Sequence, residues 1–187
     1  MNKIAMIAGL AAAATAASAD HLLEIDLGVE NQVTISSTGN VASASATASN
    51  FTGFYLADFF AVAGSPAGFG AGSGDLSTFN NASDGSPSLF QGSSSVGLNI
   101  WSFSTDSTVS VDAGAQAFAG SATWSLSAAQ YAEFLGAATA GDIYMNADTD
   151  DDIAAGATFV GTYAVVPAPS AFALLGLGGM VATRRRR

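Results

Sequence analysis

The sequence predicts a mainly β protein, an antiparallel, jelly-roll-like β-sandwich with one short helix, between two terminal targeting segments. Three observations favour this fold class. Apolar and polar residues alternate with period two in several short stretches, as in strands with one solvated face. Segments rich in Gly, Ser and Asn separate these stretches, as turns and loops do. Only one stretch of the body has the spacing of an amphipathic helix.

The first strand signals lie directly after the N-terminal segment. Apolar residues alternate with polar ones from residue 23 to residue 29, and the same parity resumes at Val33 and Ile35. Gly39-Asn40 then separates residues 33–38 from residues 41–48. Both residue types tolerate positive φ, so we expect a two-residue hairpin connection there.

Residues 51–62 hold the densest group of aromatic side chains, and they permit two interpretations. The group could be a carbohydrate-stacking platform. We expect it to be core instead, because a body short of large aliphatic residues needs aromatic area to bury. Residues 63–95 are rich in Gly, Ser and Asn, and they predict long loops with a short strand near Leu89-Phe90.

Regular patterns fill the second half of the body. Residues 96–103 predict a strand that is buried on both faces. Ser127 with Gln130 forms a capping box, which predicts a helix over residues 127–138 with Tyr131, Phe134 and Leu135 on its apolar face. The other expected strands are residues 108–112, 116–126, 143–145 and 159–165.

Charge is distributed very unevenly. The five cations are Lys3 and the four terminal arginines, whereas all fifteen Asp and Glu residues lie between Asp20 and Asp152. The body therefore carries −15, with His21 as its one imidazole. Nucleic acid and anionic lipid surfaces are disfavoured as partners of the body, because phosphates need Lys or Arg at the contacts. Zero cysteines exclude disulfides and thiolate chemistry.

Residues 1–19 predict a secretory signal peptide. Lys3 supplies the positive start, an apolar stretch follows, and Ala17-Ser18-Ala19 matches the small-residue site that a signal peptidase cuts. The alternative is an N-terminal anchor that stays in place. Residues 20–164 then form an extracytoplasmic β-rich domain.

Residues 165–187 form a second targeting segment. Pro167-Ala168-Pro169 precedes an apolar run from Ala171 to Ala182, which is shorter than the ~20 residues that a membrane span needs. The basic end, Arg184, Arg185, Arg186 and Arg187, acts as a membrane stop on the cytoplasmic side and leaves the body outside. A plain membrane anchor is the alternative interpretation.

This tail resembles the sorting signal of PEP-CTERM proteins, in which a short Pro-x-Pro motif, an apolar transmembrane helix and an arginine cluster follow one another. Ala168 stands where that family's motif has Glu. The resemblance implies processing by an exosortase-like membrane protease in Gram-negative-type bacteria. It also implies inner-membrane anchoring, then a cell-surface or extracellular location, in association with extracellular polysaccharide or biofilm matrix.

The acidic segment of residues 146–156 is the sharpest local signal in the body. Alternating oxygen ligands at Asn146, Asp148, Asp150 and Asp152 suggest a candidate Ca²⁺ site. The segment fails the EF-hand template, because counting from Asp148 puts Ile153 where that loop needs Gly. The alternative is a solvated hairpin turn.

Catalytic signals are weak, and we expect no enzyme and no catalytic residue. A single imidazole offers no Ser-His-Asp arrangement, and Glu133 or Asp142 could serve a glycosidase only as a residual hypothesis. The sequence therefore predicts an exported structural or interaction protein of the surface or matrix. The alternative is a Ca²⁺-assisted carbohydrate-binding module that uses the acidic segment and exposed aromatics such as Trp101.

Overall fold

The computed structural model describes residues 21–64, 67–81, 85–92, 95–103 and 107–166. The sorting motif at Pro167, Ala168 and Pro169, the terminal arginines and the signal-cleavage residues Ala17 and Ala19 lie outside the described residues. No helix of the described ranges is both long and apolar enough to span a membrane.

The mainly β prediction is confirmed. Ten strands form one sheet in the order β5-β8-β9-β4-β13-β14-β1-β2-β12-β6, and two short ribbons pair β10 with β3 and β11 with β7. The strands are β1 (His21–Asp26), β2 (Gln32–Ser37), β3 (Ala46–Ser49), β4 (Phe54–Leu56), β5 (Ala67–Ala71), β6 (Ser73–Gly74), β7 (Ser77–Thr78), β8 (Ser88–Gln91), β9 (Leu98–Trp101), β10 (Thr108–Val111), β11 (Phe118–Ala119), β12 (Ser121–Ser125), β13 (Ala140–Met145) and β14 (Thr158–Val166). Among the described pairs, only β1 with β14 is parallel.

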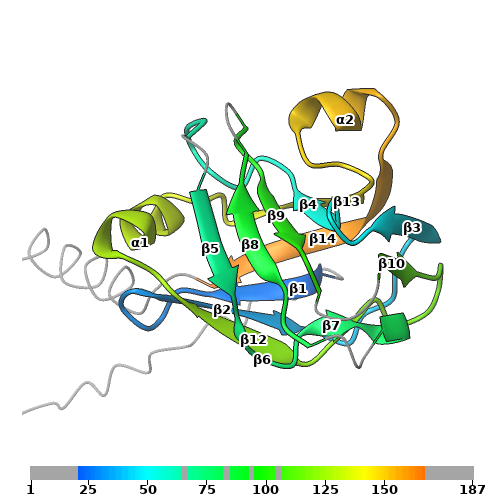
Figure 1. The fold of residues 1–187 in the computed structure, drawn as a ribbon, viewed down its shortest axis with the longest axis horizontal. Helices are drawn as coiled ribbons and strands as arrows, with labels where there is room; N and C mark the ends of the chain where they lie inside the picture. Colours follow the sequence, from blue (N-terminus) through cyan, green and yellow to red (C-terminus); the bar gives the residue numbers. More distant parts are fainter. Residues whose placement is uncertain (1–20, 65–66, 82–84, 93–94, 104–106, 167–187) are drawn as a thin grey trace, which may run out of the picture.

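The sheet folds over on itself and nearly closes. Figure 1 shows β5, β8 and β9 crossing in front of β14, β1 and β2. The two edge strands, β5 and β6, are consecutive in the chain and are separated only by Gly72. At this seam Pro87 O accepts the Gly72 amide at 3.0 Å and the Trp124 indole N–H at 3.2 Å. One polypeptide corner therefore joins the two ends of the sheet.

Aromatic side chains fill much of the core, as expected for residues 51–62. Phe54, Tyr55 and Phe59 are fully buried, whereas Phe51 is 77% exposed. Helix α1 (Ala128–Leu135) has the predicted capping box between Ser127 and Gln130. Its Phe134 is buried against three aromatic rings at centroid distances of 5.3 Å, those of Phe59, Phe60 and Phe69. Leu135, expected on the same face, is 51% exposed.

The predicted hairpin at Gly39-Asn40 is wrong. Strand β2 pairs with β1 and β12, while β3 pairs with β10. The turn lies earlier, where Asn31 adopts a φ of 59° and Val29 is exposed. The small residues of the 41–48 segment offer little apolar area, so β12 with its buried Trp124 occupies that edge of β2 instead.

Two further corrections concern segments expected to be loops. The strand near Leu89-Phe90 is confirmed as β8, but the described part of residues 63–95 also holds β5, β6, β7 and the 3₁₀ turn η1 (Phe79–Asn81). The expectation of a single helix is wrong, because the acidic segment contains helix α2 (Asp150–Ala154). The Asp152 carboxylate of this segment caps the helix. The period-two pattern of the flanking strands does not predict such a cap.

Replacing Gly72 with alanine tests the seam. An added Cβ would lie 2.6 Å from the buried Trp124 ring, and overpacking of this kind costs roughly 1–3 kcal/mol. Gly68→Ala on β5 is the matched control, because nothing lies within 4 Å of its Cβ position. Urea unfolding should show a lower free energy of unfolding for Gly72→Ala only. Equal stability of the two variants would contradict the closure of the sheet at this seam.

Candidate functional site

The acidic segment uses its last candidate metal ligand as a helix cap. Asp152 Oδ2 accepts hydrogen bonds from the Asp148 amide at 3.0 Å and from both the amide and the hydroxyl of Thr149 at 3.1 Å. Thr149 is the residue that precedes α2, so these bonds form a capping box. The carboxylate thus satisfies donors that the first turn of a helix leaves unpaired.

Asp150 binds the sheet beneath α2. Its Oδ1 accepts the Tyr55 hydroxyl proton at 2.6 Å, and the same hydroxyl lies 2.5 Å from Ser95 Oγ. Burial, and then the hydrogen bond to Asp150, raise the pKa of Tyr55 well above its ordinary value. Tyr55 therefore stays a neutral donor, and it fixes the start of α2 on the sheet.

Helix α2 covers the middle of the outer face of the sheet. Cross-strand pairing places Phe90, Asn99, Tyr55, Tyr144 and Phe159 in one row over five adjacent strands. Tyr55 forms a second small core with Ala57 and Ala147, and Ile153 of α2 packs against it. At one end of the row, Phe90 is half-buried, and the adjacent Asn99 is buried.

A pocket with aromatic walls lies beside α2 on that side. Its volume is about 270 Å³, and we name it the aromatic pocket; its lining residues are Phe51, Phe90, Gly92, Asn99, Trp101, Asp148 and Thr149. The rings of Phe90 and Trp101 are 5.6 Å apart with their planes inclined by 50°. Three separate parts of the chain meet here: the turn after β3, strands β8 and β9, and the residues before α2.

Two local features bring Phe51 to this place. Gly53 has a φ of 59°, and a Cβ at this position would lie 2.2 Å from Ile100 O, so only glycine lets the turn approach β9 this closely. Asn50 joins the turn to the residues after β9, because its Oδ1 accepts the Phe103 amide at 2.7 Å. Phe51 is thereby held outside the core, next to Trp101.

Two residues that line the aromatic pocket carry buried polar atoms without a hydrogen-bond partner. Across the described residues five buried side-chain polar atoms have no hydrogen bond, and two of them, Asn99 Oδ1 and Trp101 Nε1, belong to residues that line this pocket. Asn99 is only 2% exposed, and its amide nitrogen donates to Ala147 O at 3.4 Å. An unsatisfied buried donor or acceptor costs roughly 1–3 kcal/mol, so a hydrogen-bond partner at either atom would be stabilising.

The carboxylates near the pocket differ in their electrostatics. Burial, and then the hydrogen bond to Asp152, raise the pKa of Asp148. Hydrogen bonds from the Asp148 amide and side chain lower the pKa of Asp152. Negative charge is thus less favourable on Asp148, which lines the pocket, than on Asp152, which caps α2.

The four predicted Ca²⁺ ligands make different interactions in the structure. Asn146 turns the chain with a φ of 62°, Asp148 lines the aromatic pocket, and Asp150 and Asp152 bind Tyr55 and the helix cap. Within the described ranges no three His, Asp or Glu side chains are grouped as a metal site would require.

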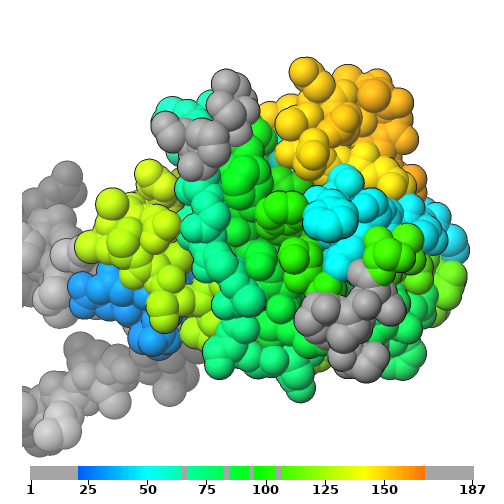
Figure 2. Space-filling model, viewed as in Figure 1, coloured from blue at the N-terminus to red at the C-terminus, as the bar shows by residue number. Residues whose placement is uncertain are grey.

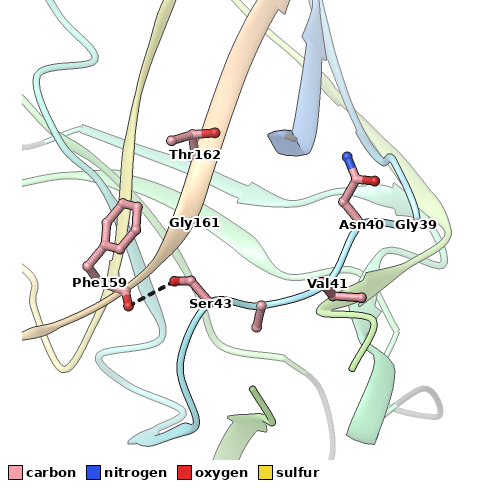
Figure 3. Close-up of a pocket in the computed structure, with 8 residues that line it drawn as sticks. Gly39, Asn40, Val41, Ser43, Phe159, Gly161 and Thr162 are labelled. Atoms are coloured by element: carbon pink, nitrogen blue, oxygen red, sulfur yellow. Dashed lines mark hydrogen bonds between the residues drawn. The ribbon is translucent and has the colours of Figure 1, made fainter. Parts of the chain in front are cut away.

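Residues considered for catalysis lie elsewhere. His21 begins β1, and its Nδ1 lies 3.0 Å from Thr162 Oγ1. Glu133 is exposed on α1, and Asp142 on β13 accepts the Tyr144 hydroxyl at 3.4 Å. A larger hollow of about 610 Å³ lies between residues 39–43 and β14 (Figure 3). None of its described lining residues is ionisable, and Ser43 Oγ there donates to Phe159 O.

The comparisons with known proteins add no relative. No family model matches the chain, and neither the search of curated proteins nor that of solved structures finds a match. The sequence pointed to Trp101, to the acidic segment and, in the less favoured interpretation of residues 51–62, to Phe51, but not to Phe90 or Asn99. The alternation of β9 puts Asn99 and Trp101 on one face, and this signal was available in the sequence.

The cap of α2 can be tested by substitution. Asp152→Ala removes three hydrogen bonds and should lower the free energy of unfolding by about 1 kcal/mol. Asp151→Ala, in the same helical turn, is the matched control, because its carboxylate lies in the first turn without being the capping residue. Chemical denaturation of both variants measures the difference. Equal losses would contradict the capping assignment.

The pH dependence of this loss follows from the lowered pKa of Asp152. In the unfolded chain an Asp has a pKa of about 3.9. The stabilisation by ionised Asp152 is therefore present above that value and disappears as the pH falls through the lower folded pKa. The stability difference between wild type and Asp152→Ala should shrink on acidification. A difference that grows in acid would contradict the charge-assisted cap.

Proposed function

We propose that this protein is an exported, non-enzymatic interaction protein of the cell surface or extracellular matrix. The observation that carries the proposal is the separation of charge: residues 21–166 contain no Lys or Arg, and the cations are confined to Lys3 and to residues 184–187. A basic end stays on the cytoplasmic side of a membrane, so the anionic body is the part that crosses.

The two ends supply the route. A signal peptidase cuts after Ala19, and residues 165–187 then hold the body at the inner membrane. An exosortase-like protease processes the tail at Pro167-Ala168-Pro169 and releases the body to the surface. The finer fold assignment, an antiparallel jelly-roll-like sandwich, is part of this proposal, and the sheet that folds over on itself supports it.

Export predicts a specific processed mass. Protein recovered from its native host should lack residues 1–19 and the segment after Pro169, because both ends are removed during delivery. Ala17→Phe with Ala19→Phe should retain the first 19 residues, since the cleavage site needs small side chains there. Ser18→Phe between them is the matched control and should be processed normally. A cytosolic protein that keeps both ends would overturn the proposal.

A Ca²⁺-assisted carbohydrate-binding module is the second candidate. The aromatic pocket favours it, because Trp101 lies there together with Asp148 and Thr149 of the acidic segment. Metal binding would need Asp150 and Asp152 to release Tyr55 and the helix cap.

Calorimetry separates the two candidates. The first predicts no heat of binding and no change of melting temperature at about 1 mM Ca²⁺, the range in which extracellular modules bind this ion. Asp148→Asn with Asp150→Asn serves as the metal-blind reference. A calcium-dependent rise of the melting temperature that this double variant lacks would favour the module.

A further inference from the structure

We infer that the aromatic pocket binds a neutral sugar ring of a polysaccharide, and that no metal ion takes part. The ring would stack on Trp101 and Phe51 while its hydroxyl groups meet Asn99. This inference rests on the proposed function only because export places the body where polysaccharide is found.

The walls of the aromatic pocket suit the carbon face of a sugar. Phe51 is 77% exposed, although its burial in the core would stabilise the fold. Gly53 and Asn50 hold it outside the core, beside Trp101. Phe90 and Trp101 meet at a 50° tilt, so the two rings form a wedge. A pyranose ring has apolar C–H faces and a polar rim, and therefore fits aromatic walls with polar groups between them.

The unpaired polar atoms indicate which groups the ligand carries. Trp101 Nε1 can only donate a hydrogen bond, and Asn99 Oδ1 can only accept one. A hydroxyl group both donates and accepts, so ligands rich in hydroxyls can satisfy the two atoms together. A purely apolar ligand would leave both atoms unpaired.

Charge argues against anionic ligands, and hydrogen bonding argues against quaternary ammonium ligands. Anionic ligands are repelled, because residues 21–166 contain no Lys or Arg and Asp148 lines the pocket. A quaternary ammonium group would suit the aromatic rings. It has no hydrogen-bonding atom for Trp101 Nε1 or Asn99 Oδ1, so both atoms would stay unpaired with such a ligand.

The neighbouring carboxylates explain why no metal is needed. Asp152 accepts three protein donors and Asp150 accepts the Tyr55 hydroxyl, so both already have hydrogen-bond partners. These bonds fix α2 and thereby Asp148 and Thr149 at the edge of the pocket. The side of the aromatic pocket next to α2 is thus held in place by hydrogen bonds within the protein, without a metal ion.

Size and position fit one ring of a longer chain. The volume of about 270 Å³ lies just below the roughly 300 Å³ at which the usual range of ligand pockets starts, so the pocket suits a single ring. In Figure 2 the green surface of β8 and β9 lies beside the cyan surface and the yellow-orange surface of α2, on an open face of the molecule. The rest of a polysaccharide can therefore leave along the surface.

The test uses the full chain in affinity electrophoresis and calorimetry. Four neutral polysaccharides serve as probes: dextran, laminarin, mannan and hydroxyethyl cellulose. Alginate represents anionic polymers and choline represents quaternary ammonium ligands. We expect at least one neutral polymer to bind, equally with and without EDTA, and neither alginate nor choline to bind.

The variants assign the binding to the pocket. Phe51→Ala and Trp101→Ala should each weaken binding about tenfold or more, because each removes a stacking face. Phe79→Ala is the matched control, an exposed phenylalanine on η1 outside the pocket. Phe51→Ala should leave the melting temperature unchanged, which separates loss of binding from loss of folding. Trp101→Phe keeps a ring face and removes the N–H, so its affinity should lie between those of wild type and Trp101→Ala.

Several outcomes would overturn the inference: no neutral polymer bound, choline bound in the pocket, binding abolished by EDTA, or Phe51→Ala and Trp101→Ala as tight as wild type. These readouts are independent of export. An exported and processed protein that binds no neutral polymer removes the inference alone. A cytosolic protein that keeps both ends and still binds sugar removes the proposed function alone.

Discussion

A body without lysine or arginine can pair its carboxylates only with water or with N–H and O–H groups, and several turns and a helix cap of the described structure use such pairs. Asp26 accepts the Gly28 amide at 2.6 Å, and Asp75 accepts the Ser121 amide at 3.0 Å. Asp112 accepts the side chain of Asn80 at 3.1 Å, and Asp152 caps α2. Hydrogen bonds to ionised acceptors are about twice as strong as neutral ones, so turns and caps do here what ion pairs do in other proteins.

The same constraint shapes the candidate site. Two carboxylates hold α2 on the sheet, and among the described residues that line the adjoining aromatic pocket Asp148 is the one acidic side chain. Tyr55 connects the two regions, because its ring lies under α2 and its hydroxyl binds Asp150. A negatively charged protein thus presents a mostly uncharged, aromatic pocket. Such a surface favours neutral ligands rich in hydroxyl groups over charged polymers.

Much of the fold could be predicted from the sequence, because several elements form from interactions between residues that are close together in the chain. The capping box of α1, the doubly buried β9 and the aromatic core around Phe54 are such cases. Strand partners were predicted less well, since the choice of β10 rather than β2 for β3 depends on which distant strand offers more apolar area. Helix α2 was missed because Asp152 also matches a calcium-loop pattern. Phe51 was assigned to the core because the effect of Gly53 on its position depends on contact with β9.

The most direct test of the account is a crystal structure of the protein grown with both Ca²⁺ and a neutral oligosaccharide. We expect a sugar ring against Trp101 and Phe51, a hydroxyl group bound to Asn99 Oδ1, and Asp152 still capping α2 without metal. A calcium ion bound by Asp148, Asp150 and Asp152, with the α2 cap opened, would contradict the account, as would a sugar bound elsewhere with the aromatic pocket empty.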